Sequence, residues 1–172
     1  GIWLPFDDEG TPENSVTLVK NGIFKGFLHS RFTAFILKEN PTGNARTPSP
    51  MDPPMVRMRN TFFNAGELSK EEIFEELKNG IFIIGSVGGE TRDDGTFVFA
   101  AKRAYRIVNG EKKEALKSVN IRGHIEYLLR NISNATRSIK VTIGLCEKGG
   151  QTILVGYGGP FLYIKGILIS GG

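Results

Sequence analysis

The sequence has little of what several common kinds of site require. It contains one cysteine and two histidines in 172 residues. A single cysteine excludes a disulfide within the chain, so a reducing compartment is compatible with it. A metal site made by this chain alone would need His29 and His124 beside Cys146, and none of them lies in a spaced ligand motif. We interpret His124, at the start of an expected helix, as a surface or capping residue.

Long apolar runs, basic clusters and nucleotide-binding motifs are also missing. No apolar run approaches the ~18 residues of a membrane helix, so we expect a soluble, cytoplasmic protein with no membrane partner. Lys and Arg exceed Asp and Glu by only 22 to 18 and are scattered in pairs. This argues against a nucleic-acid partner, which usually needs a clustered basic face. There is no G-x-G-x-x-G between a strand and a helix, no P-loop and no Ser/His/Asp order typical of hydrolases.

The residues that are present predict antiparallel sheet. With 40% hydrophobic and 23% charged residues, the chain fits one globular domain with a core. The apolar runs 16–20 and 23–28 flank Asn21-Gly22, and Asn-Gly supplies the two positive-φ positions of a type I′ hairpin turn. A second hairpin is expected around Asn109-Gly110.

Further strands and two short helices complete the expected fold. Ser69 and Glu72 form a capping box that begins one helix, which Asn79-Gly80 ends, and a second helix begins near Gly123. Strand-like runs occur at 55–63, 81–86, 96–101, 104–108, 140–144, 152–157 and 161–170. We therefore predict an α+β domain with two short helices, built on a mostly antiparallel, curved and barrel-like sheet.

Two segments lack a regular pattern. The carboxylates at 7–9 could in principle hold Ca²⁺, but no alternating ligand spacing follows, so a solvated loop is the simpler interpretation. The segment Glu39–Pro54 contains five of the eight prolines, which makes regular structure unfavourable. It is interpreted either as a surface lid or partner-contacting arm, or as a mobile loop. We expect it to be poorly ordered and sensitive to proteases.

Cys146 follows the β-branched run 141–143 and precedes Gly149-Gly150, so its thiol should sit at a strand end. It is either a small buried hydrophobe or a presented thiol, since the glycines near it allow close approach of another group. The run 55–63 places Arg57 and Arg59 on one face of a strand. They could hold a carboxylate or line a groove, although solvated charges are the commoner explanation.

Six motifs follow one another in order along nearly the whole chain. They are Asp7-Asp8-Glu9-Gly10-Thr11-Pro12, Asn21-Gly22 with Lys25-Gly26-Phe27-Leu28, Thr42-Gly43-Asn44, Arg57-Met58-Arg59-Asn60-Thr61, Gly95-Thr96-Phe97-Val98-Phe99, and Gly144-Leu145-Cys146 with Lys148 and Gln151. A Gly-Gly pair closes the chain. Each motif is weak, but their succession is specific, and the chain resembles the C-terminal domain of the TldD/PmbA family. That family is often labelled "modulator of DNA gyrase" and includes zinc-dependent proteases.

The resemblance implies a zinc site that this chain cannot complete. TldD-type members carry H-E-x-x-x-H in the N-terminal part, whose histidines bind zinc beside a glutamate general base, and a cysteine thiolate from the C-terminal domain is a further ligand. Cys146 matches that cysteine, although Glu147-Lys148 follows it where the family commonly has Gly-Lys. Residues 1–172 are thus expected to be the C-terminal domain of a longer protein. Zinc is expected in that full-length protein and none bound to this fragment.

Two functional classes stay open. The chain is either part of a TldD-like zinc metalloprotease that cleaves unfolded peptides, or a non-catalytic PmbA-like module for assembly or peptide binding. Binding to nucleic acid or gyrase ranks last. The expected partners are the missing N-terminal domain, a second subunit in a homodimer or TldD/PmbA hetero-oligomer, and a peptide. Asn60 or Gln151 would bond the peptide backbone, with Arg57 beside them, in a channel shared with Cys146.

We predict that the isolated 172-residue chain neither hydrolyses peptides nor holds zinc tightly. One thiolate leaves most of the coordination shell to water. Metal analysis of the purified chain should find zinc well below stoichiometric. Stoichiometric zinc that Cys146→Ala removes would make His29 or His124 a ligand and contradict the shared site.

Overall fold

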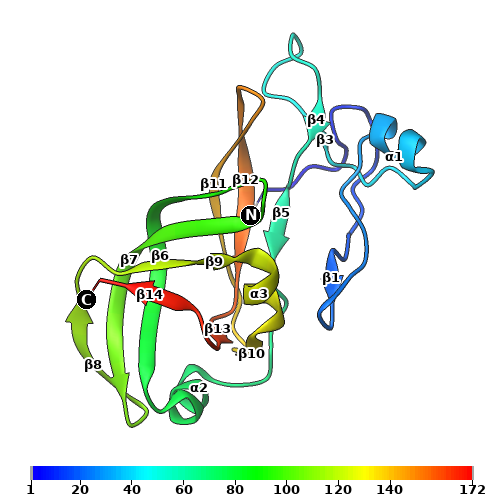
Figure 1. The fold of residues 1–172 in the computed structure, drawn as a ribbon. Helices are drawn as coiled ribbons and strands as arrows, with labels where there is room; N and C mark the ends of the chain where they lie inside the picture. The colour runs from blue at the N-terminus through cyan, green and yellow to red at the C-terminus, as the bar shows by residue number, and fades with distance from the viewer. Residues whose placement is uncertain (1, 172) are drawn as a thin grey trace. The chain divides into compact units, whose positions relative to one another are not determined.

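The computed structural model describes residues 2–171, and these form two units. The first unit comprises residues 2–63 and 140–159, and the second comprises residues 64–139 and 160–171. Both contain more strand than helix, which confirms the predicted α+β class (Figure 1). Within the described residues, no helix is long and apolar enough to cross a membrane.

The first unit begins with the predicted Asn-Gly hairpin. Strands β1 (Val19–Lys20) and β2 (Ile23–Phe24) pair around Asn21 and Gly22, whose φ values are 52° and 72°. Both lie in the left-handed region that a type I′ turn requires, so this prediction is confirmed, although the strands are shorter than expected.

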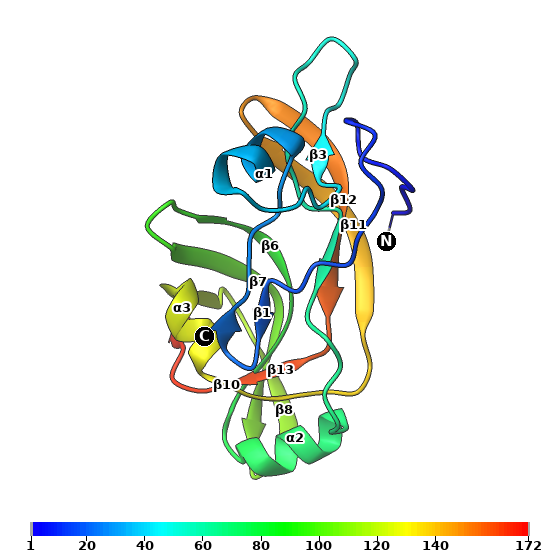
Figure 2. The same ribbon diagram turned by 90° about the vertical axis from the view of Figure 1, so that its right-hand side faces the viewer.

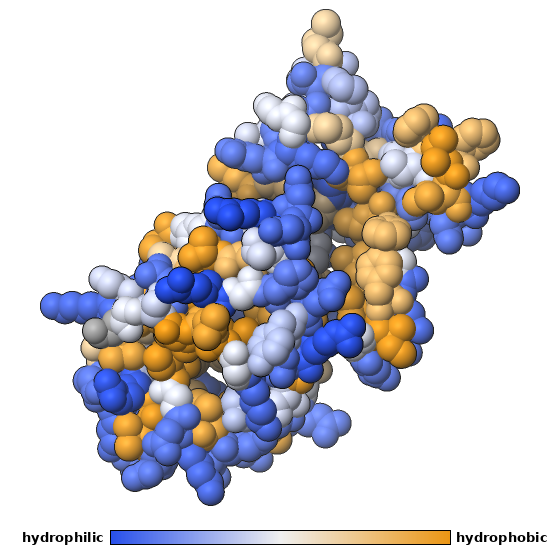
Figure 3. All heavy atoms as spheres, viewed as in Figure 1, coloured by the Kyte–Doolittle hydropathy of each residue, from blue (hydrophilic) through white to orange (hydrophobic). Residues whose placement is uncertain are grey.

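Helix α1 (Arg31–Leu37) follows and was not predicted. Ser30 begins the helix, because its side chain accepts a hydrogen bond from the Thr33 backbone. The Thr33 side chain accepts one from the Ser30 backbone, which completes a capping box. The sequence signal was missed because Thr replaces the Glu or Gln usual at that position. Only Ala34 of the helix is buried, while Phe35 is 81% exposed, and apolar side chains gather on the surface over α1 (Figure 3).

The rest of the first unit is a small sheet and a strand pair. Strand β12 (Gln151–Gly159) pairs antiparallel with β11 (Lys140–Lys148) and parallel with β5 (Asn60–Phe62). Strands β3 (Ala45–Arg46) and β4 (Met55–Val56) form a separate antiparallel pair. The single strand predicted over 55–63 is therefore broken.

The second unit is built on long antiparallel strands. Its main sheet runs in the order β14 (Leu168–Ser170), β9 (Asn120–His124), β7 (Thr96–Val108) and β6 (Gly80–Thr91). The hairpin strand β8 (Glu111–Leu116) also pairs with β7. The runs 96–101 and 104–108, expected as separate strands, are one strand of 13 residues. Strands β6 and β7 curve along their length (Figures 1 and 2).

Two helices and a strand pair complete the second unit. Helix α2 (Lys70–Leu77) has the predicted capping box, and α3 (Ile125–Arg130) begins at His124, which caps it as expected. Strands β10 (Ile132–Ala135) and β13 (Leu162–Ile164) pair antiparallel. Over residues 2–171 the sheets are curved but not closed into barrels, which corrects the barrel-like expectation, and three short helices are present where two were predicted.

Aromatic rings form the centre of the second unit. The ring of Phe82 lies 5.0 Å from that of Phe74 on α2 and 5.1 Å from that of Phe161. Both pairs are edge-to-face, which aromatic quadrupoles favour. Ile107, 1% exposed, is the largest fully buried side chain among the described residues. This packing holds α2 against its sheet.

We predict that Ser69→Ala destabilises the chain by about 1 kcal/mol, the usual cost of losing an N-cap. Ser69 Oγ accepts from the Glu72 backbone at 3.1 Å, and Glu72 Oε2 accepts from the Ser69 backbone at 2.6 Å. Denaturant unfolding should show the loss, and Ser69→Asp should preserve most of the stability. An unchanged midpoint in Ser69→Ala would show that the cap contributes nothing.

The same cap should weaken in acid. The hydrogen bond from the Ser69 backbone, followed by that from its side chain, lowers the pKa of Glu72 below its ordinary value of 4.5. A lowered pKa adds stability above the unfolded-state pKa, and this is lost as pH falls through the folded-state pKa. The difference between wild type and Glu72→Gln should therefore be present at neutral pH and shrink below about pH 4, the range of an ordinary carboxyl pKa.

Candidate functional site

Cys146 lies within β11 and not at its end, because the strand continues to Lys148. The chain then turns at Gly149 and Gly150, whose φ values of 56° and 77° suit the left-handed region that glycine favours. Cys146 is opposite Ile153, which is 6% exposed, so its half-buried side chain is on the buried face of the hairpin. The expected strand end is wrong, but the thiol is neither fully buried nor fully exposed.

The turn end of this hairpin is bonded to the last part of the proline-rich segment and to β4 just after it. Lys148 Nζ donates to the carbonyl of Val56 at 3.0 Å, and Gln151 Nε2 donates to the carbonyl of Pro53 at 3.0 Å. Gln151 is 8% exposed. It lies two residues before Ile153, the pairing partner of Cys146, so Gln151 and Cys146 are on the same face of the hairpin. The structure therefore brings Cys146 and Gln151 together.

Arg57 joins them. Its side chain is only 2% exposed, and its Nη2 donates to the carbonyl oxygens of both Cys146 and Gln151, the latter at 3.2 Å. The interpretation of Arg57 as a solvated surface charge is wrong. Arg57 lies between β4 and β5, where the chain passes from one strand pair to the other sheet. From there its side chain reaches the hairpin of β11 and β12.

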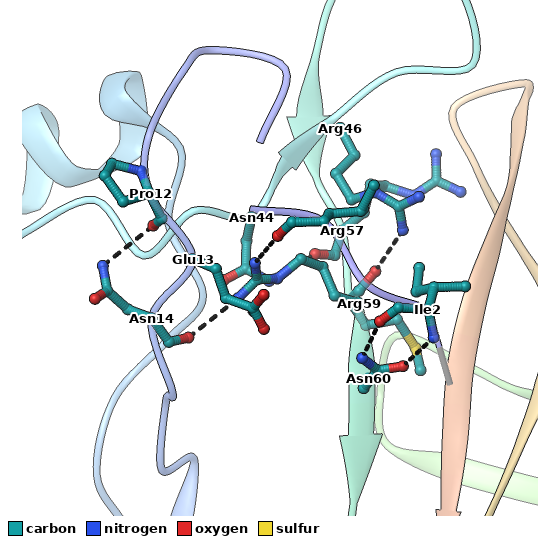
Figure 4. A network of polar contacts seen from close by, with 11 residues as sticks. Ile2, Pro12, Glu13, Asn14, Asn44, Arg46, Arg57, Arg59 and Asn60 are labelled. Atoms are coloured by element: carbon teal, nitrogen blue, oxygen red, sulfur yellow. Dashed lines mark hydrogen bonds and ion pairs between the residues drawn. The ribbon is translucent and has the colours of Figure 1, made fainter. Parts of the chain in front are cut away.

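Two further arginines donate to main-chain carbonyls (Figure 4). Arg46 Nη1 donates to the carbonyls of Leu154 at 2.8 Å and Met58 at 3.2 Å. Arg59, 7% exposed and so also not solvated, donates to the Asn14 carbonyl at 3.1 Å. Each guanidinium thus ties a loop to another segment of the first unit.

The positive charges lie close enough to influence one another. Burial lowers the pKa of the Arg46 guanidinium, and the charges of Arg57 and Arg59 act in the same direction, while those of Asp8 and Cys146 oppose it. Arg46 therefore lies near both other guanidinium groups and near Cys146.

Asn60 is not brought to Cys146. Its side-chain amide pairs with the main chain of Ile2, accepting from the N–H at 2.8 Å and donating to the carbonyl at 2.5 Å. Asn60 lies beside Gly156 in the parallel pair, and Gly156 is an odd number of residues along β12 from Ile153. Because faces alternate along a strand, Asn60 is on the face opposite to Cys146. The two side chains do not line one channel in this unit.

The acidic segment at 7–9 is a structural anchor. Asp7 is 6% exposed, and its carboxylate accepts from the backbone N–H groups of Glu9 at 3.0 Å, Thr11 at 2.8 Å and Ala45 at 3.0 Å. Asp8 accepts from the backbone of residue 47 at 2.7 Å. The interpretation as a solvated loop is wrong for Asp7, because its oxygens replace water as partners for three backbone donors.

Part of the proline-rich segment belongs to the interior of the first unit. Asn44 is 3% exposed and Ala45 is fully buried, and β3 lies within the segment expected to have no regular structure. Asn44 exchanges hydrogen bonds with the backbone of Arg57, at 2.8 and 3.0 Å. This half is therefore not a surface lid. Poor order across residues 47–54 stays a prediction.

The donors present can supply one ligand to a zinc ion. His29 is 4% exposed, with Nδ1 3.2 Å from Thr33 Oγ1, and His124 Nε2 lies 2.8 Å from the Asp94 carbonyl. Within residues 2–171 there is no group of three His, Cys, Asp or Glu side chains placed to hold a metal. Cys146 has the right donor chemistry, because a thiolate is a common zinc ligand. It fits as one member of a larger ligand set.

Comparison with known proteins assigns the chain to a family. The model of the PmbA/TldA metallopeptidase C-terminal domain matches residues 2–171. The chain belongs to the TldD/PmbA family. A zinc metalloprotease TldD homolog of Saccharolobus solfataricus is 39% identical over 166 residues, covering 96% of this chain and 38% of that protein. A metalloprotease of Methanothermobacter thermautotrophicus is 38% identical over 167 residues, 96% of this chain and 37% of its own length.

Solved structures agree with this assignment. TldE from Thermococcus kodakarensis superposes with a TM-score of 0.81 at 25% identity, covering 98% of this chain and 36% of that one. A Thermotoga maritima protein named for modulation of a DNA gyrase gives the same TM-score at 28% identity, covering 97% of this chain and 35% of that one. The TldD/PmbA domain thus spans little more than a third of the length of these relatives.

Sequence reasoning missed the supporting contacts in this TldD/PmbA domain. It singled out Arg57 and Gln151 as substrate-binding residues, and the structure shows both bonded to main-chain carbonyls of the protein itself. Separations of 89 to 98 residues along the chain leave no local pattern that could have indicated these bonds.

We predict that Asp7→Asn destabilises the chain by about 2 kcal/mol, because an amide NH₂ faces backbone donors that a carboxylate oxygen accepted. Asp8→Asn is the matched control, since Asp8 is exposed and accepts a single backbone hydrogen bond. Denaturant unfolding monitored by circular dichroism should give a clearly larger loss for Asp7→Asn. Equal losses would remove Asp7 as an anchor.

Proposed function

We propose that this chain is the C-terminal domain of a TldD-like zinc metalloprotease that cleaves unfolded peptides, and that Cys146 supplies one zinc ligand. The observation that carries this is the half-buried thiol on a fastened hairpin in a chain of this family. Support comes from two relatives that are named metalloproteases, one of them a zinc metalloprotease. Since the chain covers only 38% and 37% of those proteins, the activity belongs to a longer polypeptide.

The residues of this chain would hold and orient the metal without completing its shell. Zinc, when bound, lowers the pKa of a coordinated water and polarises a peptide carbonyl. Cys146 would contribute charge and one fixed direction, because its carbonyl and that of Gln151 are both held by Arg57. The remaining donors and the general base would come from the N-terminal domain.

The free side of β11 suits an extended peptide. In the sheet order β11-β12-β5, β11 is an edge, and no other strand among the described residues pairs with it. A protease that accepts many sequences gains most from main-chain hydrogen bonds, which an open edge offers by strand addition. The two-residue turn at 149–150 makes Lys148 and Gln151 a hydrogen-bonded pair. By alternation, the backbone groups of Ile143, Leu145 and Glu147 face the open edge.

Three side chains were expected to contact substrate, and they have different parts in this proposal. Arg57 and Gln151 act beside Cys146, and their polar contacts to the protein make them supports for the hairpin. Asn60 already pairs its amide with a peptide main chain, that of Ile2, so its contribution to peptide binding would be on the other face of the sheet.

A non-catalytic role is the alternative. The structural similarity to TldE, with a TM-score of 0.81, supports a PmbA-like module in a homodimer or TldD/PmbA hetero-oligomer. The exposed apolar side chains of α1 are consistent with cover from an N-terminal domain or a second subunit. Zinc binding by the longer protein, which H-E-x-x-x-H would provide, separates the two proposals.

Cys146→Ser in the full-length protein should abolish peptide hydrolysis through loss of metal. A serine hydroxyl does not ionise near neutral pH and is a poor zinc ligand compared with a thiolate. Leu145→Ser is the matched control, since Leu145 is the preceding residue on the opposite face and is 69% exposed. Elemental analysis should find zinc absent from Cys146→Ser and retained in Leu145→Ser. Full zinc in both variants contradicts the ligand assignment.

Ile143→Pro should weaken peptide binding in the full-length protein. Proline removes one backbone donor from the open edge of β11, and edge positions tolerate it better than central ones. We expect KM to rise severalfold with zinc content and kcat close to wild type. Ile143→Ala removes the same side chain but keeps the donor, so its KM should stay near wild type. Equal KM values for both variants would place the peptide elsewhere.

A further inference from the structure

We propose that Arg57 is the positioning residue for Cys146, holding the thiol in the direction that a metal requires. This inference rests on the proposed function, because it assigns Arg57 a task only if Cys146 is a ligand. Nothing in the chain's local sequence links the two residues, which are separated by 89 positions. The link is made by the fold of the first unit alone.

The contact is a clamp across two strands. One nitrogen, Nη2, donates both to the carbonyl of Cys146 on β11 and to that of Gln151 on β12. These strands meet at a two-residue glycine turn, the part of a hairpin most prone to fraying. A single rigid guanidinium bound to both strands therefore fixes their spacing and twist beside the thiol.

The clamp also fixes the direction in which the side chain of Cys146 leaves the backbone. In a strand, the carbonyl and the Cα–Cβ bond of one residue have set relative directions, so holding the carbonyl holds Cβ. Metal sites tolerate deviations of only about 0.5 Å and 10–20° in ligand placement. A hairpin that twisted more freely would spread the sulfur over a larger volume than that.

The burial of Arg57 argues for support and against direct contact with substrate. The side chain is 2% exposed, and Nε and Nη1 are covered and have no hydrogen-bond partner among the protein atoms described. In the described part of the chain no carboxylate lies within ion-pair distance of it. Burying a guanidinium without an anionic partner costs free energy, and the hydrogen bonds to the carbonyls of Cys146 and Gln151 offset part of that cost. A peptide entering from solvent cannot reach the covered nitrogens.

Arg59 offers a matched control. It is also buried, at 7% exposure, and it also donates to main-chain carbonyls, but these belong to Leu4 and Asn14. Removing either guanidinium deletes a buried cation from the same unit. Only Arg57 contacts the hairpin that carries Cys146, so the two variants separate positioning from general destabilisation.

The first measurement uses the isolated chain and needs no metal. Because Cys146 is the only cysteine, a trifluoromethyl label on its sulfur gives one fluorine signal. Wild type should show one narrow resonance, and Arg57→Met should show a broadened or second resonance. Amide hydrogen exchange at residues 146–151 should rise at least tenfold in Arg57→Met. Arg59→Met should leave the fluorine signal and this exchange as in wild type.

Two results of this measurement would overturn the proposal. One is a wild-type fluorine signal and wild-type exchange in Arg57→Met. The other is the same change in Arg57→Met and Arg59→Met, which would mean that the unit is loosened as a whole. If Arg57→Met does not fold, Arg57→Lys serves instead, since one ammonium can reach one carbonyl. It should give a partial change confined to residues 146–151, and no change there would equally overturn the proposal.

The second measurement uses the full-length protein and separates the two claims. Arg57→Lys should lower zinc affinity about tenfold and shift the thiolate-to-metal band of the cobalt-substituted protein. Arg59→Lys should do neither. If Cys146→Ser keeps its zinc, the proposed function fails whatever Arg57 does. If Cys146→Ser loses zinc while Arg57→Lys keeps full affinity and an unshifted band, the positioning role fails and the ligand assignment stands.

Discussion

The first unit depends on burying guanidinium groups against main-chain carbonyls. Arg57 and Arg59 are nearly inaccessible to solvent, and Arg46 is partly so. Removing a guanidinium from water is costly, and each is compensated mainly by carbonyl oxygens of other segments, with one longer ion pair of 3.6 Å between Arg59 and Glu13. Each of these hydrogen bonds joins the segment that carries the arginine to another segment, so the bonds hold the loops closed around the side chains. Much of the irregular backbone in this unit is fixed in this way.

The same constraint assembles the candidate site. The carbonyls of Pro53, at the end of the proline-rich segment, and of Val56 accept hydrogen bonds from the side chains of Gln151 and Lys148 on the hairpin. Two segments far apart in the sequence are thus joined at the turn end of the Cys146 hairpin. These contacts hold the backbone on both sides of Cys146, as the proposed ligand role would require.

This TldD/PmbA domain has three features that bear on its function. This domain spans 38% of a relative's length, and it holds a half-buried thiol on a hairpin, has an unpaired strand edge at β11 among the described residues and exposes apolar side chains on α1. Each of these features is incomplete by itself. The two histidines of this chain have other contacts: His29 Nδ1 lies 3.2 Å from Thr33 Oγ1, and His124 caps α3. Under the proposed function, further polypeptide would supply what each feature lacks.

The sequence alone determined what depends on neighbours in the chain. Asn-Gly turns, the Ser69 cap and the alternation of strands were predictable because turn dihedrals and caps are local. The ordered succession of motifs also sufficed to identify the family. The tertiary structure decided which charged side chains are buried. Whether Arg57 or Asp7 is solvated or buried depends on acceptors and donors many residues away, and no local pattern records them. The opposite faces of Asn60 and Cys146 follow from a strand register that only the folded sheet defines.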